Sequence, residues 1–328
     1  MNPAIHPKEN PNSDLAYQRA ILGSVSRTFA LTIPLLPPAI EVVVSNTYLL
    51  CRIVDTIEDA AELSPPDKQH LSKLFLDSVL GIIPVDAFVI PCLDALKDYS
   101  NTDELDLISH TPTVLRILRT FPDRDQAAIS RCVSIMSDGM SHFHGRQTQE
   151  GLKDLAEFEE YCYVGAGVVG ELLTTIFSNY SPEFARRIEG HKQLAIAFGQ
   201  ALQMTNILKD SPEDRARGVS WKPATMSQAE LLKLAYKKLQ DSMSYILLIP
   251  ENEMGMRRFC FLAFGLAVMT LEKIATRKEF SKSELKLSRN TVWFFYGFTK
   301  IATSKKLLMT SFFYAASTQL RKLSAKNS

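Results

Sequence analysis

Two short stretches of the chain each carry four polar side chains at the spacing of one face of an α-helix. The first series is Tyr48, Arg52, Asp55 and Asp59, and the second is Gln203, Asn206, Asp210 and Asp214. Their steps of three and four residues follow the repeat of a helix and not the alternation of a strand. The neighbouring residues are mostly apolar, so we expect both polar faces to point into the protein. The pattern predicts two helices with inward-facing acidic faces.

Acidic side chains four residues apart repel each other, and burial increases the repulsion unless a cation lies between them. One such pair is ordinarily an exposed helix face, but two pairs with matching polar companions indicate a shared cation site. Carboxylates without Cys or His nearby suit Mg²⁺, for which Mn²⁺ can substitute, better than Zn²⁺. The predicted metal ligands are Asp55, Glu58, Asp59, Asp210 and Asp214. Because Mg²⁺ completes its shell with waters and substrate phosphates, two facing acidic helices predict a phosphorylated ligand.

Five stretches together resemble the head-to-head prenyl synthases, the squalene and phytoene synthase family. In the family's order, these are residues 26–30, 48–59, 161–170 and 202–214, and Arg217-Gly218 followed by Pro223. The resemblance covers roughly residues 15–285, and the acidic stretches are most similar to those of squalene synthases. It implies an all-α, isoprenoid-synthase-like helical bundle with a central cavity, formed as a single domain by residues 1–328.

The resemblance also implies a reaction. Squalene synthases join two farnesyl diphosphates head to head into presqualene diphosphate, and then reduce this intermediate to squalene with NADPH. The chain would then be a farnesyl-diphosphate farnesyltransferase. Tyr48 and Tyr161 would handle protons, with the released diphosphate as a rival base, and Arg52 would share the diphosphate charge.

Further binding positions follow from the resemblance. Those for diphosphate match Ser26, Arg27, Arg52, Gln203, Asn206 and Arg217, and those for the reductant match Asn206, Lys286 and Arg289. From the residues alone, Ser26-Arg27 fits a helix-capping turn with a surface arginine equally well. The chain departs from the pattern at Val219, where squalene synthases often carry an arginine, and only part of their basic cluster for the reductant is present. Pro212 is a further departure, and we expect it to kink or end the second acidic helix.

Two other functions stay open. A phytoene or dehydrosqualene synthase shares the first half-reaction and needs no reductant. A non-catalytic, lipid-binding helical protein is the second, but the four retained aspartates argue against it. The Gly-x-Gly-x-x-Gly spacing from Gly165 to Gly170 has the shape of a dinucleotide fingerprint, but no strand precedes it. We expect these small residues to allow close helix packing or to leave room for a substrate chain.

Composition argues against turn-rich β structure, nucleic-acid binding and a zinc site. Glycine accounts for 14 of 328 residues, which favours long helices over turn-rich β structure. The net charge of +1 gives no field to attract nucleic acid. The five cysteines are scattered and show no Cys-x-x-Cys spacing, which indicates reduced intracellular thiols and no zinc site.

Proline and polar clusters divide the chain into expected elements. Residues 1–13 are expected to be a flexible leader without a signal peptide, with a helix capped by residues 12–14. Further helices are expected at residues 38–63, 122–149, 182–217, 226–247 and 251–276. No apolar run reaches the length of a membrane span, so we expect a cytoplasmic protein with no obligate protein partner. The aromatic residues and interleaved lysines of 291–328 indicate peripheral contact with the membrane, or a helix packed on the domain.

Overall fold

The computed structural model describes residues 11–60, 62–144, 150–277 and 280–325, which form an all-α fold as predicted. The first elements are α1 (Pro11–Val25), α2 (Phe29–Thr32), η1 (Ile33–Leu35), α3 (Pro38–Asp59), α4 (Pro65–Val79), α5 (Asp86–Leu96), α6 (Thr102–Ser109), α7 (Thr111–Leu118) and α8 (Asp123–His144). The next are α9 (Leu155–Cys162), η2 (Tyr163–Gly167), α10 (Val168–Tyr180), α11 (Pro182–Ile188), α12 (Lys192–Ala216) and α13 (Gln228–Leu248). The last are α14 (Met254–Ala275), α15 (Lys282–Leu285), α16 (Arg289–Ala302), α17 (Lys306–Ala316) and α18 (Thr318–Ala325).

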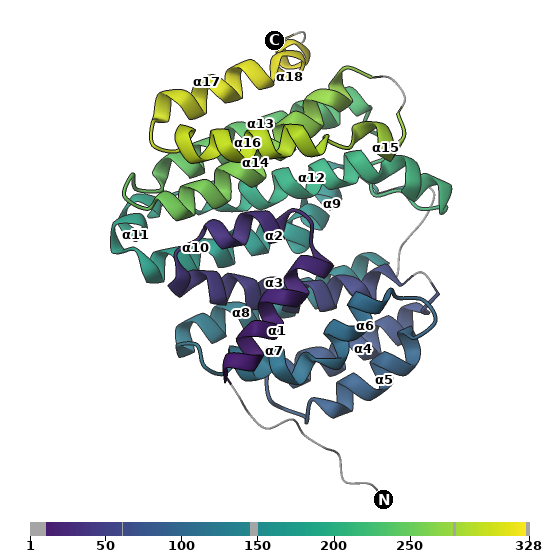
Figure 1. The fold of residues 1–328 in the computed structure, drawn as a ribbon. Helices are drawn as coiled ribbons and strands as arrows, with labels where there is room; N and C mark the ends of the chain where they lie inside the picture. Colours follow the sequence, from purple (N-terminus) through teal and green to yellow (C-terminus); the bar gives the residue numbers. More distant parts are fainter. Residues whose placement is uncertain (1–10, 61, 145–149, 278–279, 326–328) are drawn as a thin grey trace, which may run out of the picture.

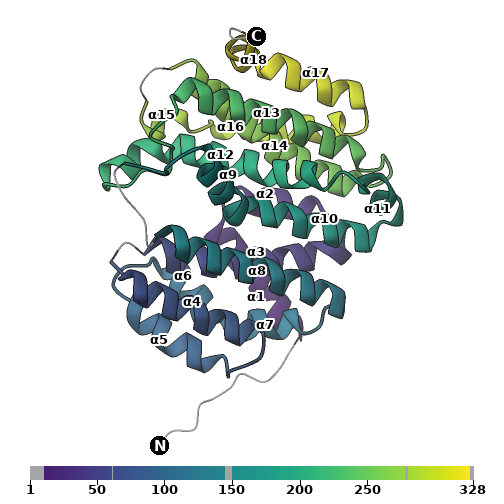
Figure 2. The same cartoon turned by 180° about the vertical axis from the view of Figure 1, so that it is seen from behind.

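The helices form two groups that share one core. Figures 1 and 2 show α1 and α3–α8 at one end of the molecule and α9–α18 at the other. Between them, α3 and α8 pack on α10, and η2 contacts both α8 and α12. The short α2 crosses from the first group to pack on α14. These contacts make a single domain, as the sequence predicted.

The first acidic helix, α3, begins as expected and ends early. Pro38 occupies its first turn, where a missing N–H costs nothing. The helix ends at Asp59, because Ala60 is extended and Ser64 starts the next helix by accepting a hydrogen bond from the Asp67 N–H. The expected end near residue 63 was therefore wrong. The consequence is that Asp59 lies at the C-terminus of α3.

The bounds of the second acidic helix differ from the prediction at two positions, Gly190 and Pro212. The predicted helix 182–217 is divided into α11 and α12, because Gly190 adopts a φ of +77° that favours glycine. Pro212 does not end α12, which continues to Ala216. Proline cannot donate to the Leu208 carbonyl, but the Ser211 hydroxyl donates to it instead at 3.1 Å. Asp214 therefore stays on the helix that carries Asp210.

The glycine-rich stretch allows close helix packing, as predicted. A Cβ atom at Gly170 would lie 2.1 Å from the Ala195 carbonyl oxygen, and one at Gly199 would lie 2.0 Å from that of Ala166. Side chains at these glycines would therefore push α10 and η2 away from α12. The stretch includes η2, a single π-helical turn, which is a feature often found at functional sites.

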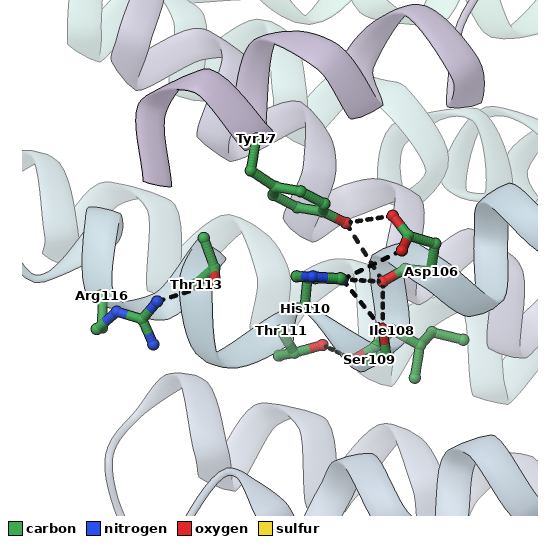
Figure 3. Close-up of polar contacts among 8 residues, drawn as sticks. All are labelled: Tyr17, Asp106, Ile108, Ser109, His110, Thr111, Thr113 and Arg116. Atoms are coloured by element: carbon green, nitrogen blue, oxygen red, sulfur yellow. Dashed lines mark hydrogen bonds and ion pairs between the residues drawn. The ribbon is translucent and has the colours of Figure 1, made fainter. Parts of the chain in front are cut away.

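The N-terminal helix α1 is longer than predicted. Residues 1–10 of the expected leader lie outside the described residues, but residues 11–13 are helical. Tyr17 fastens α1 to α6: its hydroxyl donates to the Asp106 carboxylate at 2.9 Å, and its ring stacks on His110 with centroids 4.2 Å apart (Figure 3). Burial and this carboxylate raise the pKa of Tyr17 far above its usual value. Helix α1 also packs on α3 and α7.

The remaining long helices lie close to their expected ranges. Helix α8 reaches His144, and residues 145–149 lie outside the described residues. Helix α13 begins at a capping box between Ser227 and Glu230. Helix α14 is buried on nearly all sides, as its apolar sequence indicates. Within the described residues, Leu155–Tyr180 is the one stretch apolar and long enough to cross a membrane, but 61% of its window is buried inside the protein.

Candidate active site

A cavity of about 180 Å³ lies between the two acidic helices. Its apolar lining is Phe29, Ile33, Val44, Met136, Ala166, Val169, Leu173, Phe198, Leu202, Phe259 and Ala263, with Gly165, Gly170 and Gly199. Its polar lining is Thr47, Tyr48, Cys51, Asp55, Gln203 and Asn206. The bulk of the wall is therefore hydrocarbon, and its carboxylate and amide groups come from Asp55 of α3 and from Gln203 and Asn206 of α12.

The lining of α3 shows how polarity changes along the cavity. Val44, Cys51 and Asp55 occupy one helical face, and the rise of 1.5 Å per residue separates Val44 from Asp55 by roughly 16 Å. An apolar ligand of that length would extend from the buried end of the cavity to the first acidic stretch. Because α3 and α12 both end beyond their acidic residues, the negative ends of two helix dipoles also favour a cation there.

Burial and mutual repulsion both disfavour the charged form of Asp55 in the first acidic pair, Asp55 and Asp59. Burial, and then the charge of Asp59, raise the pKa of Asp55 to about 7, although Arg52 opposes the shift. Asp59 is exposed, yet the surrounding protein still raises its pKa, with Arg52 and Arg217 opposing. Arg217, which follows α12, is thus one of the charges that act on Asp59. A cation between these groups would relieve the repulsion.

Arg52 has a partner that sequence reasoning missed. Its guanidinium forms a hydrogen-bonded ion pair with Glu104 of α6. Burial lowers the pKa of Arg52, but the charges of Asp55 and Glu104 outweigh burial and raise it. Its Nε is buried without a hydrogen-bond partner in the described structure. Glu104 lies 52 residues away, so no local pattern identifies it.

Glu58 does not join the aspartates. Its side chain is fully buried, and one carboxylate oxygen accepts hydrogen bonds from Ser72 at 3.1 Å and Ser141 at 3.0 Å. Glu58 therefore faces α4 and α8, although it lies only three residues after Asp55. This geometry does not favour the predicted role of Glu58 as a metal ligand.

The second acidic stretch is partly neutralised by bases on its own helix. Lys209 lies 3.4 Å from the Asp210 carboxylate and donates to the Asn206 side chain at 3.0 Å. Arg217, predicted to bind diphosphate, donates to the Asp214 carboxylate at 2.6 Å. The Arg217 side chain is nevertheless 64% exposed, so it can also reach a ligand at the mouth.

Tyr161 is affected by the charges of both acidic stretches. Its side chain is buried, and burial together with the charges of Asp59 and Asp214 holds its pKa far above the usual value. Trp221, which sequence reasoning missed, stacks on the Tyr161 ring with centroids 4.5 Å apart and planes 7° apart. Tyr161 therefore sits where residues of α3 and α12 both act on its hydroxyl.

The remaining diphosphate candidates lie at the start of α2. The Ser26 hydroxyl accepts a hydrogen bond from the Phe29 N–H at 3.0 Å, while the N-cap residue of α2 is Thr28. Arg27 is exposed. Tyr48 lines the cavity, donates to the Val25 carbonyl at 3.2 Å and packs on Phe29. Burial raises the pKa of Tyr48, opposed by the Ser26 hydroxyl.

The three residues predicted to bind the reductant lie in different places. Asn206 lines the cavity, whereas Lys286 and Arg289 are exposed at the connection between α15 and α16 and do not line it. Helix α15 packs on α12, so these two bases lie on an element next to the second acidic helix. The structure does not bring them together with the cavity residues.

The carboxylates fit a shared cation better than a closed metal cage. Among residues 11–60, 62–144, 150–277 and 280–325, no three His, Cys, Asp or Glu side chains gather closely enough to hold a metal. The oxygen donors of Asp55, Asp59, Asp210 and Asp214 and the raised pKa of Asp55 fit an ion that completes its shell with water and ligand oxygens.

Known proteins resemble this chain over most of its length. The profile of the squalene/phytoene synthase family matches residues 22–235. Squalene synthase R6 of Phoma sp. is 26% identical over 86% of this chain and 70% of its own length, and squalene synthase clz20 of Cochliobolus lunatus is 27% identical over 80% and 66%. This chain thus spans about two thirds of the length of these relatives.

Solved structures share the fold. A complex of TcSQS with the ligand BPH1237 superposes with a TM-score of 0.77 at 19% identity, covering 96% of this chain and 94% of that one. A dehydrosqualene synthase in complex with a ligand gives a TM-score of 0.60 at 19% identity, covering 89% and 96%. The cavity between two acidic helices and the profile match over more than half of the sequence lead to one conclusion: the chain belongs to the squalene/phytoene synthase family.

Proposed function

We propose that this protein is a prenyltransferase that condenses two farnesyl diphosphates head to head to presqualene diphosphate. One observation carries the proposal: a cavity walled mostly by hydrocarbon side chains is also lined by Asp55 of α3 and by the amides Gln203 and Asn206 of α12, which belong to the two acidic stretches. A prenyl chain fits the wall, and a diphosphate fits the end where a cation would lie. The squalene synthases among the relatives support the same reaction class.

The residues of the site divide the chemical work. Mg²⁺ held by Asp55, Asp59, Asp210 and Asp214 would supply electrophilic neutralisation of the leaving diphosphate. Arg52 and Arg217 would share that charge at the mouth. The apolar wall would exclude water from the allylic cation that ionisation leaves.

Proton handling belongs to the tyrosines in this proposal. The second farnesyl chain forms a carbon–carbon bond to the cation and loses a proton as the cyclopropane closes. Tyr161 does not line the cavity, but the charges of both acidic stretches act on its hydroxyl, which makes it a candidate to guide that proton. Tyr48 lines the cavity and is the second candidate, and the released diphosphate is a rival base.

We extend the proposal to NADPH-dependent reduction of presqualene diphosphate to squalene. Asn206 at the cavity supports this step, and Lys286 and Arg289 offer charge for the phosphates of the reductant. One observation favours a dehydrosqualene or phytoene synthase instead, because both bases lie outside the cavity lining. The mutual repulsion of Asp55 and Asp59 argues against a lipid-binding protein without activity, because such a protein would bind no cation to offset it.

We also propose peripheral contact with the cytoplasmic face of a membrane, which would receive a water-insoluble product. Five large apolar side chains of α16 and α17 are more than half exposed: Trp293, Phe294, Ile301, Leu307 and Tyr314. Residues 285–328 contain eight Lys and Arg and no Asp or Glu. A basic surface with exposed aromatic side chains suits an anionic bilayer.

The reaction is tested by incubating the purified protein with farnesyl diphosphate and Mg²⁺, with and without NADPH, and identifying the products by mass spectrometry. We expect presqualene diphosphate without the reductant and squalene with it. A C30 hydrocarbon that forms equally without NADPH would assign the chain to the non-reducing enzymes. Release of no diphosphate from either farnesyl or geranylgeranyl diphosphate would refute the prenyltransferase proposal.

A further inference from the structure

Trp221 occupies an unusual place for a tryptophan on a connecting loop. It follows α12 by five residues and is only half-buried, yet its indole lies flat on the buried ring of Tyr161. Phe143 of α8 meets the same tyrosine edge-on, with centroids 5.2 Å apart. Tyr161 is thus enclosed by one aromatic side chain from the core and one from the surface loop. Of these two, Trp221 is the one that is partly exposed.

The loop that carries Trp221 is fastened on both sides. The Val219 N–H donates to the Asp214 carbonyl at 2.9 Å, which ties the loop to the second acidic stretch. Beyond Trp221, Leu152 exchanges two backbone hydrogen bonds of 3.2 Å with Lys222 and Ala224.

The second fastening requires a glycine. Gly151 has a φ of +81°, and a Cβ there would lie 2.1 Å from the Lys222 carbonyl oxygen. The segment before α9 and the loop after α12 therefore lie in direct backbone contact. This framework sets the position of the indole with little freedom.

The stacking on Trp221 is a contact that can fix the orientation of the Tyr161 ring. Within the described residues the Tyr161 hydroxyl forms no hydrogen bond, so no polar contact of its own fixes the ring. Stacking orients the ring and leaves the hydroxyl free of a protein partner among these residues.

We propose that Trp221 is a positioning residue, which holds the ring of Tyr161 beside the two acidic stretches and keeps water from it. This role rests on the proposed condensation, in which Tyr161 guides the proton lost on cyclopropane formation and water must not trap the allylic cation. Trp221 itself touches no reacting atom in this proposal and acts through Tyr161.

The first test measures how well Trp221 shields Tyr161 from solvent, and it needs no substrate. Hydroxyl-radical footprinting read by peptide mass spectrometry reports how accessible Tyr161 is. We expect Trp221→Ala to raise oxidation of Tyr161 several-fold and Trp221→Phe, which keeps a flat ring, to restore protection. Trp293→Ala removes the only other tryptophan, from an exposed site on α16, and leaves the Tyr161 footprint unchanged. Protection of Tyr161 in folded Trp221→Ala overturns the proposal.

The second test uses product partition. With farnesyl diphosphate and Mg²⁺, Trp221→Ala should lower kcat by roughly 10- to 100-fold with little change in KM, because a proton-handling group is misplaced. The fraction of farnesol should rise relative to C30 product, and Trp221→Phe should return both values toward wild type. If the alanine variant is unstable, Trp221→Leu keeps an apolar loop side chain without the ring and should behave alike.

The outcomes separate the two proposals. Equal farnesol fractions in the wild-type, alanine and phenylalanine proteins overturn the positioning role while the condensation stands. No turnover of farnesyl diphosphate by the wild-type protein refutes the condensation, and the footprint then still decides whether Trp221 covers Tyr161.

Discussion

Asp55 illustrates how burial changes the charge of the first acidic stretch. Folding raises the pKa of Asp55 from 3.8 to about 7, so the folded state holds that proton more tightly than the unfolded state. The resulting contribution to stability is present below about pH 4 and is lost as the pH rises through 7. Above pH 7 the metal-free protein therefore carries an unfavourable charge at this position.

The first prediction is that Asp55→Asn removes this pH dependence. At pH 8 without Mg²⁺, the variant should unfold at higher urea concentration than the wild type, and the difference should vanish near pH 4. With Mg²⁺, its turnover should fall by roughly two orders of magnitude or more, since a metal contributes several kcal/mol to such a step.

Asp98→Asn, on the exposed connection after α5, is the matched control and should change neither stability nor turnover. Asp210→Asn should reproduce the loss of turnover from the second helix. Turnover near wild type in either active-site variant would show that these carboxylates do not hold the cation.

At the scale of elements, α12 shows how a helix passes a proline. The second prediction concerns Ser211, whose hydroxyl replaces the N–H that Pro212 lacks. Ser211→Ala should cost about 1 kcal/mol of unfolding free energy, because the Leu208 carbonyl loses its donor. In a Pro212→Ala background the same change should cost much less, since an alanine backbone supplies the missing N–H. Urea unfolding of the four proteins measures the coupling, and equal costs in both backgrounds would contradict it.

Arg257 joins the ends of two helices. Its fully buried guanidinium donates to the carbonyl of Ile249, the C-cap of α13, at 2.8 Å and to that of Thr303, the C-cap of α16, at 3.2 Å. The third prediction is that Arg257→Met destabilises the fold by about 3 kcal/mol, because two buried carbonyls lose donors. The neighbouring Arg258→Met removes only one 3.4 Å bond and should cost less than about 1 kcal/mol. Similar unfolding midpoints for the two variants would argue against this role.

Sequence periodicity predicted the helices well because each acidic face repeats locally. Boundaries were less predictable: Ser64 starts a new helix instead of merely ending α3, and Ser211 compensates for Pro212. The partners of the site residues could not be predicted at all. Glu104 meets Arg52, and Trp221 meets Tyr161, only after segments 52 and 60 residues apart have folded together. The charge of Glu58 suggested a ligand, but its helical phase points it at Ser72 and Ser141.

At the scale of the whole molecule, charge is divided unevenly. Residues 285–328 hold eight basic and no acidic residues, so the rest of the chain has 29 basic against 36 acidic residues. The basic segment forms α16–α18, which lie at the end of the molecule opposite α4 and α5 (Figure 1). A net charge near zero thus conceals two oppositely charged regions.

The fourth prediction tests this division. Lys305→Glu with Lys306→Glu should weaken binding to vesicles of phosphatidylserine and phosphatidylcholine, since each lysine near an anionic surface contributes about 1 kcal/mol. Lys73→Glu with Lys97→Glu makes the same charge change on α4 and α5 and should leave sedimentation with vesicles unaltered. Equal sedimentation of both variants, or binding unaffected by the anionic lipid, would leave α16 and α17 as a surface for another protein chain or a second copy.

If a cation binds between the acidic stretches of α3 and α12, as proposed, the site has a consequence for the order of binding. Without a cation, the mouth of the cavity repels a diphosphate, so the apo protein discriminates against the ligand that its apolar wall would accept. Cation and prenyl diphosphate must then each increase the affinity of the other by the same factor, as thermodynamic reciprocity requires. Departure of the diphosphate would likewise loosen the cation, so that every catalytic cycle resets the electrostatic barrier at the mouth.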